Sequence, residues 1–124
     1  MHELTVEAAF SSAHNIRGYE GACENLHGHN WRVEAAVSSK TLDSLGMVHD
    51  FKVLKSMLKD VLDPLDHKYL NEVPPFDKLN ATAENIARHI FRELKKALKK
   101  KDRRLKVSRV RVWESEKASA SYSE

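Results

Sequence analysis

Residues 27–38 have the sequence HGHNWRVEAAVS, in which alternate positions carry apolar or imidazole side chains. This period of two predicts a β-strand with one buried face, because successive side chains of a strand point to opposite sides of the sheet. The rise of a strand places the two histidines of that face about 7 Å apart. The predicted buried face consists of His27, His29, Trp31, Val33, Ala35 and Val37.

The preceding stretch LTVEAAFSSAH, at residues 4–14, alternates in the same way and predicts a second strand. Pairing of the two strands would bring His14 close to the two histidines of residues 27–38. The buried face predicted for this strand consists of Leu4, Val6, Ala8, Phe10, Ser12 and His14.

Two amphipathic helices are predicted further along the chain, with Asp50 and Thr82 as their N-caps. Strands at about residues 107–115 and 117–123 follow them. The order ββααββ predicts an α+β fold, in which an antiparallel sheet carries both helices on one face. The edge strands of so small a sheet favour pairing with other subunits, so we expect a homo-oligomer.

Length and composition predict one globular domain spanning residues 1–124, since 41% of the residues are hydrophobic and 31% are charged. The apolar runs are far shorter than the roughly 20 residues needed to cross a bilayer, and no secretory signal is recognisable, so we expect no membrane partner. A single cysteine cannot form an intramolecular disulfide, which fits a reducing, cytoplasmic location.

The net charge of +3 is unevenly distributed, because residues 95–106, KKALKKKDRRLK, contain eight Lys or Arg and one Asp. A basic patch can bind nucleic acid, but no aromatic residue is interleaved with this one. Cations also favour the last turn of a helix, where carbonyl groups are exposed. We therefore interpret the run as a solvated helix end and expect no nucleic-acid partner.

Three histidines on predicted buried faces, His14, His27 and His29, indicate a metal site. Burying unpaired imidazoles is costly, and a metal ion that accepts their lone pairs removes that cost. Imidazole is the commonest protein ligand for zinc, and three ligands with an open fourth position are typical of a catalytic site. We expect Zn²⁺ as the cofactor.

Cys23, the only thiol of the chain, has three interpretations that its spacing from His27 leaves open. It could be a fourth zinc ligand, which would make the site structural. It could be a small buried hydrophobic residue. It could also be a thiol beside the metal, whose charge favours the thiolate as a base or nucleophile.

Two further groups have both a structural and a chemical interpretation. Asp66 and His67 follow a predicted helix end, where they could form a turn or an acid–base pair. Glu114 is a polar residue on an apolar strand face, where it could form a surface salt bridge or accept hydrogen bonds from a guanidine-like ring edge.

Six elements of the sequence form a specific set: FSSAH (10–14), CENLHGHN (23–30), GMVHDF (46–51), LDHKYLN (65–71), TAENIA (82–87) and Glu114. This set resembles the 6-pyruvoyl-tetrahydropterin synthase superfamily, in particular its bacterial and archaeal 6-carboxytetrahydropterin synthases. The interval between Cys23 and His27 is similar to theirs and shorter than is typical of the pyruvoyl-forming animal enzymes.

The resemblance implies a tunnelling fold, in which the sheets of several subunits join into a β-barrel, usually in a hexamer built as a dimer of trimers. It implies the conversion of 7,8-dihydroneopterin triphosphate to 6-carboxy-5,6,7,8-tetrahydropterin, acetaldehyde and triphosphate, in queuosine or 7-deazapurine biosynthesis. Two alternatives remain open. One is a 6-pyruvoyltetrahydropterin synthase that only eliminates triphosphate, and the other is a non-catalytic zinc-binding module with Cys23 as the fourth ligand.

The resemblance also implies a role for each candidate residue, in sites that are completed at a subunit interface. Cys23 would be the thiolate base, and His67, oriented by Asp66, the complementary acid–base group. Glu114 would accept hydrogen bonds from the pterin, with assistance from Thr82. The zinc ligands would be His14, His27 and His29.

Overall fold

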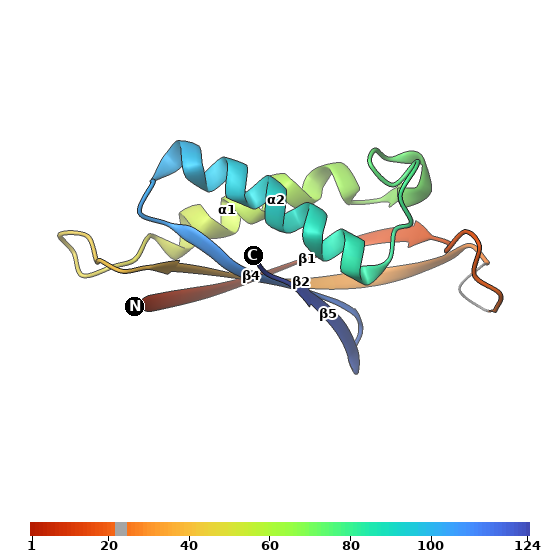
Figure 1. Ribbon diagram of the computed structural model, residues 1–124, viewed down its shortest axis with the longest axis horizontal. Helices are drawn as coiled ribbons and strands as arrows, with labels where there is room; N and C mark the ends of the chain where they lie inside the picture. The colour runs from red at the N-terminus through yellow and green to blue at the C-terminus, as the bar shows by residue number, and fades with distance from the viewer. Residues whose placement is uncertain (22–24) are drawn as a thin grey trace.

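The computed structural model describes residues 1–21 and 25–124, which form one sheet and two helices (Figure 1). Each strand and helix predicted from the sequence is present. Two short 3₁₀ turns, η2 (Asp63–Leu65) and η3 (Leu70–Glu72), flank an additional strand, β3. The strands are β1 (His2–His14), β2 (His27–Ser39), β3 (Lys68–Tyr69), β4 (Lys106–Ser115) and β5 (Ala118–Tyr122), and the helices are α1 (Phe51–Leu62) and α2 (Ala83–Lys101).

The sheet has the strand order β3-β1-β2-β4-β5. β1 and β2 pair along their whole length, with His2 opposite Ser39 and His14 opposite His27. The four longer strands are antiparallel, as predicted. The prediction of a purely antiparallel sheet is wrong at one edge, because β3 pairs in parallel with β1 at Ser12 and Ala13. A strand of two residues is too short to produce a recognisable alternation.

Over the described residues the sheet is open, with β3 and β5 as its outer strands. Closure into a barrel requires the sheets of other subunits. The oligomeric barrel therefore stays a prediction.

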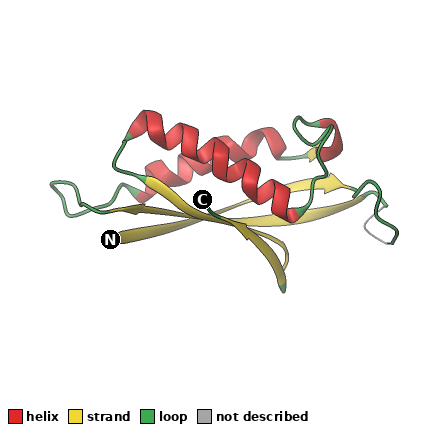
Figure 2. Cartoon of the chain, viewed as in Figure 1, coloured by secondary structure: helices red, strands yellow, loops and turns green. Residues whose placement is uncertain are grey.

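Both helices cover the same face of the sheet, as predicted (Figures 1 and 2). The Asp50 side chain caps α1 by accepting a hydrogen bond from the Lys52 N–H at 2.7 Å. Thr82 caps α2 through the Asn85 N–H at 3.1 Å. The last turn of α2 holds exposed Lys99, Lys100 and Lys101, which fits a solvated helix end. No helix in the described part of the chain is both long enough and apolar enough to cross a membrane.

The hydrophobic core lies between the helices and the sheet. Leu58 of α1 and Leu94 of α2 are at most 1% exposed. At one end of the core the rings of Phe10 and Trp31 stack with their centroids 6.0 Å apart. The Trp31 ring also packs against the group of histidines, since its centroid lies 4.9 Å from that of His14.

Replacing Leu58 by Ala should lower the free energy of unfolding by about 2–5 kcal/mol, because the side chain leaves a cavity in a closely packed layer. Equilibrium unfolding in urea at a fixed protein concentration measures the change. Lys55→Ala on the exposed side of α1 is the control and should stay within about 0.5 kcal/mol of the wild type. Similar losses for both variants would contradict this description of the core.

Candidate metal centre and active site

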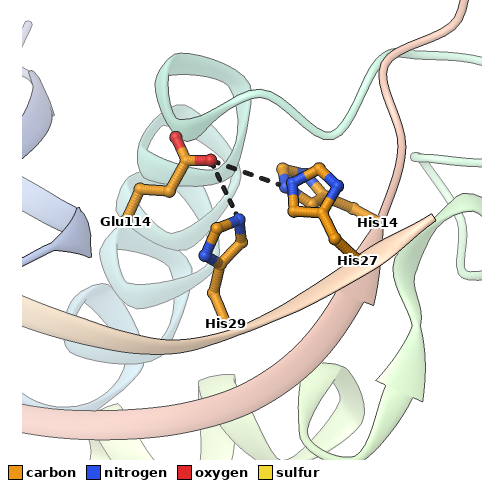
Figure 3. A group of neighbouring side chains, drawn as sticks. All are labelled: His14, His27, His29 and Glu114. Atoms are coloured by element: carbon orange, nitrogen blue, oxygen red, sulfur yellow. Dashed lines mark ion pairs between the residues drawn. The ribbon is translucent and has the colours of Figure 1, made fainter. Parts of the chain in front are cut away.

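The three histidines predicted as metal ligands meet at one end of the β1–β2 pair (Figure 3). His14 is the last residue of β1 and lies opposite His27, the first residue of β2. His29 follows on the same face of β2. The ring centroids lie 4.6 Å apart for His14 and His27, 5.1 Å for His14 and His29, and 4.7 Å for His27 and His29.

Glu114 of β4 points toward these imidazoles (Figure 3). The pairing of β4 with β5 shifts in register between Trp113 and Ser115, an irregularity of the kind that redirects a side chain. Glu114 Oε1 lies 3.0 Å from His29 Nε2 and 3.7 Å from His14 Nε2. One possible ligand atom from each of the three histidines and Glu114 lies within 4.8 Å of the others, so the four residues could hold a metal ion.

Backbone carbonyls determine which nitrogen of two imidazoles faces the centre. His14 Nδ1 lies 2.7 Å from the carbonyl oxygen of Ala81, and His27 Nδ1 lies 2.6 Å from that of Asn25. A carbonyl oxygen can only accept a hydrogen bond, so Nδ1 carries the proton in both rings and Nε2 keeps its lone pair. This is the usual arrangement of metal-binding histidines.

The Nε2 atoms of His14 and His29 are buried and make no hydrogen bond within the described residues. Glu114 Oε1 lies within ion-pair distance of His29 Nε2, at 3.0 Å. Burial lowers the pKa of both imidazoles, and it is only partly opposed, for His14 mainly by the Ala81 hydrogen bond and for His29 mainly by the charge of Glu114. Neutral imidazoles whose buried Nε2 atoms lack a hydrogen-bond partner are suited to a divalent cation, so the residues present fit the predicted zinc ion.

A cavity of about 200 Å³ adjoins this group and is lined by His14, Tyr19, Thr82, Glu84 and Glu114, among others. The predicted substrate-binding residues Thr82 and Glu114 therefore share one cavity with a predicted metal ligand. The Thr82 hydroxyl oxygen already accepts the Asn85 N–H, which leaves its proton free to donate. The cavity thus offers a carboxylate acceptor and a hydroxyl donor.

The predicted acid–base pair, Asp66 and His67, lies between η2 and β3. His67 Nδ1 is 3.0 Å from Asp66 Oδ1, which also accepts the Ser11 N–H at 2.9 Å. That backbone hydrogen bond, together with the His67 contact, lowers the pKa of Asp66. The His67 side chain is 83% exposed and has an unusual backbone φ of 56°.

His67 lines a second cavity of about 510 Å³ with Ser11, His29 and Asn30. No residue lines both this cavity and the one that contains Glu114. Within the described residues, His67 of the acid–base pair and the predicted pterin-binding residues thus line different cavities, with His29 of the His67 cavity 3.0 Å from Glu114 of the other.

The predicted catalytic residue Cys23 lies outside the described residues. Sequence reasoning missed the carbonyl groups of Ala81 and Asn25 that orient the imidazoles. Every residue has a carbonyl group, so no side-chain pattern could have indicated these two.

Comparison with known proteins gives a consistent result. A model of the family "6-pyruvoyl tetrahydropterin synthase" matches residues 3–124. The 6-carboxy-5,6,7,8-tetrahydropterin synthase of Haemophilus influenzae is 36% identical, over 100% of both chains. A putative 6-carboxy-5,6,7,8-tetrahydropterin synthase of Archaeoglobus fulgidus is 40% identical, over 91% of this chain and 88% of that one. The structure of Caenorhabditis elegans 6-pyruvoyl tetrahydropterin synthase superposes with a TM-score of 0.81 and 27% identity, covering 100% of this chain and 97% of that one.

Replacing His27 by Ala should weaken binding of a divalent metal by more than about 100-fold, because loss of a ligand exceeds the 10- to 100-fold cost of losing a ligand's hydrogen-bond partner. Metal content after dialysis, measured by mass spectrometry, and a zinc titration would show the change. His2→Ala, at the exposed start of β1, should leave binding unchanged. Full metal content in the His27→Ala protein would remove this residue from the ligand set.

Proposed function

Because the chain belongs to the 6-pyruvoyl tetrahydropterin synthase family, we propose that it is a zinc-dependent 6-carboxy-5,6,7,8-tetrahydropterin synthase. Its substrate is then 7,8-dihydroneopterin triphosphate, and its products are 6-carboxy-5,6,7,8-tetrahydropterin, acetaldehyde and triphosphate. The names of the relatives that are 36% and 40% identical support this choice within the family. The product would enter queuosine or another 7-deazapurine pathway.

The main support from the structure is the group of imidazoles whose Nε2 atoms converge at the end of β1 and β2. His14, His27 and His29 would hold the zinc ion. Three nitrogen ligands and an open fourth position are typical of catalytic zinc. When bound, the ion would supply Lewis acidity at the hydroxyl and carbonyl oxygens of the substrate side chain.

Glu114 and Thr82 would orient the pterin in the adjoining cavity. The 2-amino group and the ring N–H of a pterin form an edge of two donors, which a carboxylate can accept in a bidentate manner. Glu114 supplies that carboxylate, and the free Thr82 hydroxyl proton could serve a pterin acceptor. Glu114 also lies close enough to the imidazoles to be a metal ligand when no substrate is bound.

Proton transfer at the substrate side chain would involve Cys23 as a thiolate base and His67 as its partner. A zinc ion beside the thiol would favour the thiolate. Asp66 Oδ1 lies 3.0 Å from His67 Nδ1 and would favour a proton on that nitrogen, which would leave Nε2 available to transfer a proton. The Ser11 N–H fixes Asp66 in turn, so the pair is held in one orientation.

We place the complete active site between subunits of a homo-oligomer, a hexamer built as a dimer of trimers. The different cavities of His67 and Glu114 support this arrangement, in which a neighbouring chain would bring its pterin-binding residues to His67. The open sheet, with β3 and β5 at its edges, could extend into neighbouring sheets to form the barrel.

The nearest alternative function is that of a 6-pyruvoyltetrahydropterin synthase, which is favoured by the similarity to the Caenorhabditis elegans enzyme structure. That reaction eliminates triphosphate but does not cleave the carbon–carbon bond. A non-catalytic zinc-binding module with Cys23 as a ligand is a second alternative. It would lose metal and fold in a Cys23→Ala variant, whereas the proposed enzyme would keep both.

Incubation of the zinc-loaded protein with dihydroneopterin triphosphate should yield acetaldehyde and a carboxypterin, detected by derivatisation and mass spectrometry. A pyruvoyl product without acetaldehyde would support the alternative synthase. Absence of turnover by an intact, zinc-bound oligomer would overturn both enzymatic assignments.

Replacing Glu114 by Gln should raise KM for dihydroneopterin triphosphate, because an amide presents only one acceptor oxygen to the donor edge of the pterin.

Cys23→Ala and His67→Ala should each lower kcat by about 10²- to 10⁴-fold, the usual contribution of a general acid or base. If the two residues of one active site come from different chains, mixed oligomers of the two variants contain some complete sites. Co-expression should then restore measurable activity, as seen in the kcat of the mixture. No recovery in mixed oligomers would place Cys23 and His67 in the same chain's site.

A further inference from the structure

Two asparagine side chains, one in η3 and one in the loop that precedes α2, form hydrogen bonds with the segment after His14. Asn71 Oδ1 accepts the Asn15 N–H at 3.1 Å, and Asn71 Nδ2 donates to the Asn15 carbonyl at 3.0 Å. Asn80 repeats this pattern on Arg17, accepting its N–H at 3.1 Å and donating to its carbonyl at 3.0 Å. Each side-chain amide thus satisfies both backbone polar groups of one residue, as a neighbouring strand would.

Asn80 directly precedes Ala81, whose carbonyl oxygen accepts the hydrogen bond from His14 Nδ1 at 2.7 Å. The backbone is also held on both sides of Ala81. The Asn80 carbonyl accepts from Asn85 Nδ2 at 3.0 Å, and Thr82 Oγ1 accepts the Asn85 N–H at 3.1 Å. Ala81 itself is fully buried, so its carbonyl group has little freedom to turn away from the His14 ring.

These contacts form a closed circuit. The chain runs from His14 to Arg17, crosses to Asn80 through the two amide hydrogen bonds, and returns from Ala81 to His14 through the imidazole. Replacing Asn80 by Ala would remove the two hydrogen bonds that join residue 80 to Arg17, next to the carbonyl that orients His14. The Arg17 guanidinium and Asn71 would still hold the loop, so the expected effect is a looser Ala81 carbonyl and not a detached loop.

We propose that Asn80 is a positioning residue of the metal centre, which holds the Ala81 carbonyl against His14 and so sets the tautomer and orientation of this ligand. The inference rests on the metal centre of the proposed function but not on the reaction. Loss of a partner that orients a metal-binding histidine typically costs 10- to 100-fold in metal affinity. A cost in this range is therefore expected when the Asn80 amide is removed.

To test this, the metal-free, full-length oligomer is titrated with Co²⁺ in the presence of a competing chelator. The visible absorption of bound Co²⁺ reports the binding. Asn80→Ala should bind Co²⁺ about 10- to 100-fold more weakly than the wild type and show an altered cobalt spectrum. Asn80→Asp keeps the acceptor for the Arg17 N–H and loses the donor, so its affinity should be intermediate. If Asn80→Ala does not fold, as judged by circular dichroism, Asn80→Asp provides the same comparison.

Arg17→Ala is the matched control. The Arg17 guanidinium donates to the carbonyls of Phe76 at 2.8 Å and Leu79 at 3.2 Å, so this variant weakens the same loop but keeps the backbone groups that Asn80 binds. It should bind Co²⁺ like the wild type.

Three results would overturn the inference. Unchanged affinity in Asn80→Ala would show that the amide does not position His14. Equal losses in Asn80→Ala and Arg17→Ala would indicate general loosening of the loop. A wild-type protein that fails to bind Co²⁺ would overturn the metal centre as well, whereas tight binding without pterin turnover would overturn the proposed reaction alone.

Discussion

The register between β1 and β2 is the constraint on which the metal centre depends. Phe10 lies opposite Trp31 on the buried face of this pair, and His14 lies opposite His27 at its end. A shift by one residue would turn the side chains of one strand to the other face of the sheet. The apolar packing that stabilises the core therefore also brings the imidazoles together, on rigid strands rather than on a loop.

Burial of the His14 imidazole has a free-energy cost that a metal ion can remove. His14 is 1% exposed, and its Nε2 has no hydrogen-bond partner among the described residues. The free energy of core packing must offset the burial of that atom in the metal-free protein. Metal binding should therefore stabilise the fold as well as complete the site. The Ala81 carbonyl and the loop held by Asn80 belong to the same preorganised arrangement.

The strands and helices could be predicted because their buried faces repeat with clear periods and because Asp50 and Thr82 are good N-caps. The three histidines that the structure brings together were also predicted from the sequence, because they lie on the predicted buried faces. The strand β3 was missed, since two residues show no period. The contacts of Asn80 were missed because they are made with the backbone of Arg17, which is distant in sequence. The sequence also did not indicate that His67 and Glu114 line different cavities, because cavity shape depends on how distant segments pack.

In the proposed metal centre, three imidazoles hold a zinc ion whose fourth position is open to the substrate. X-ray absorption at the zinc edge of the loaded, full-length protein measures this coordination. It should show three nitrogen neighbours at about 2.0–2.1 Å together with an oxygen, and no sulfur. A sulfur neighbour at about 2.3 Å would contradict this coordination, because Cys23 would then close the coordination sphere and the zinc would be structural.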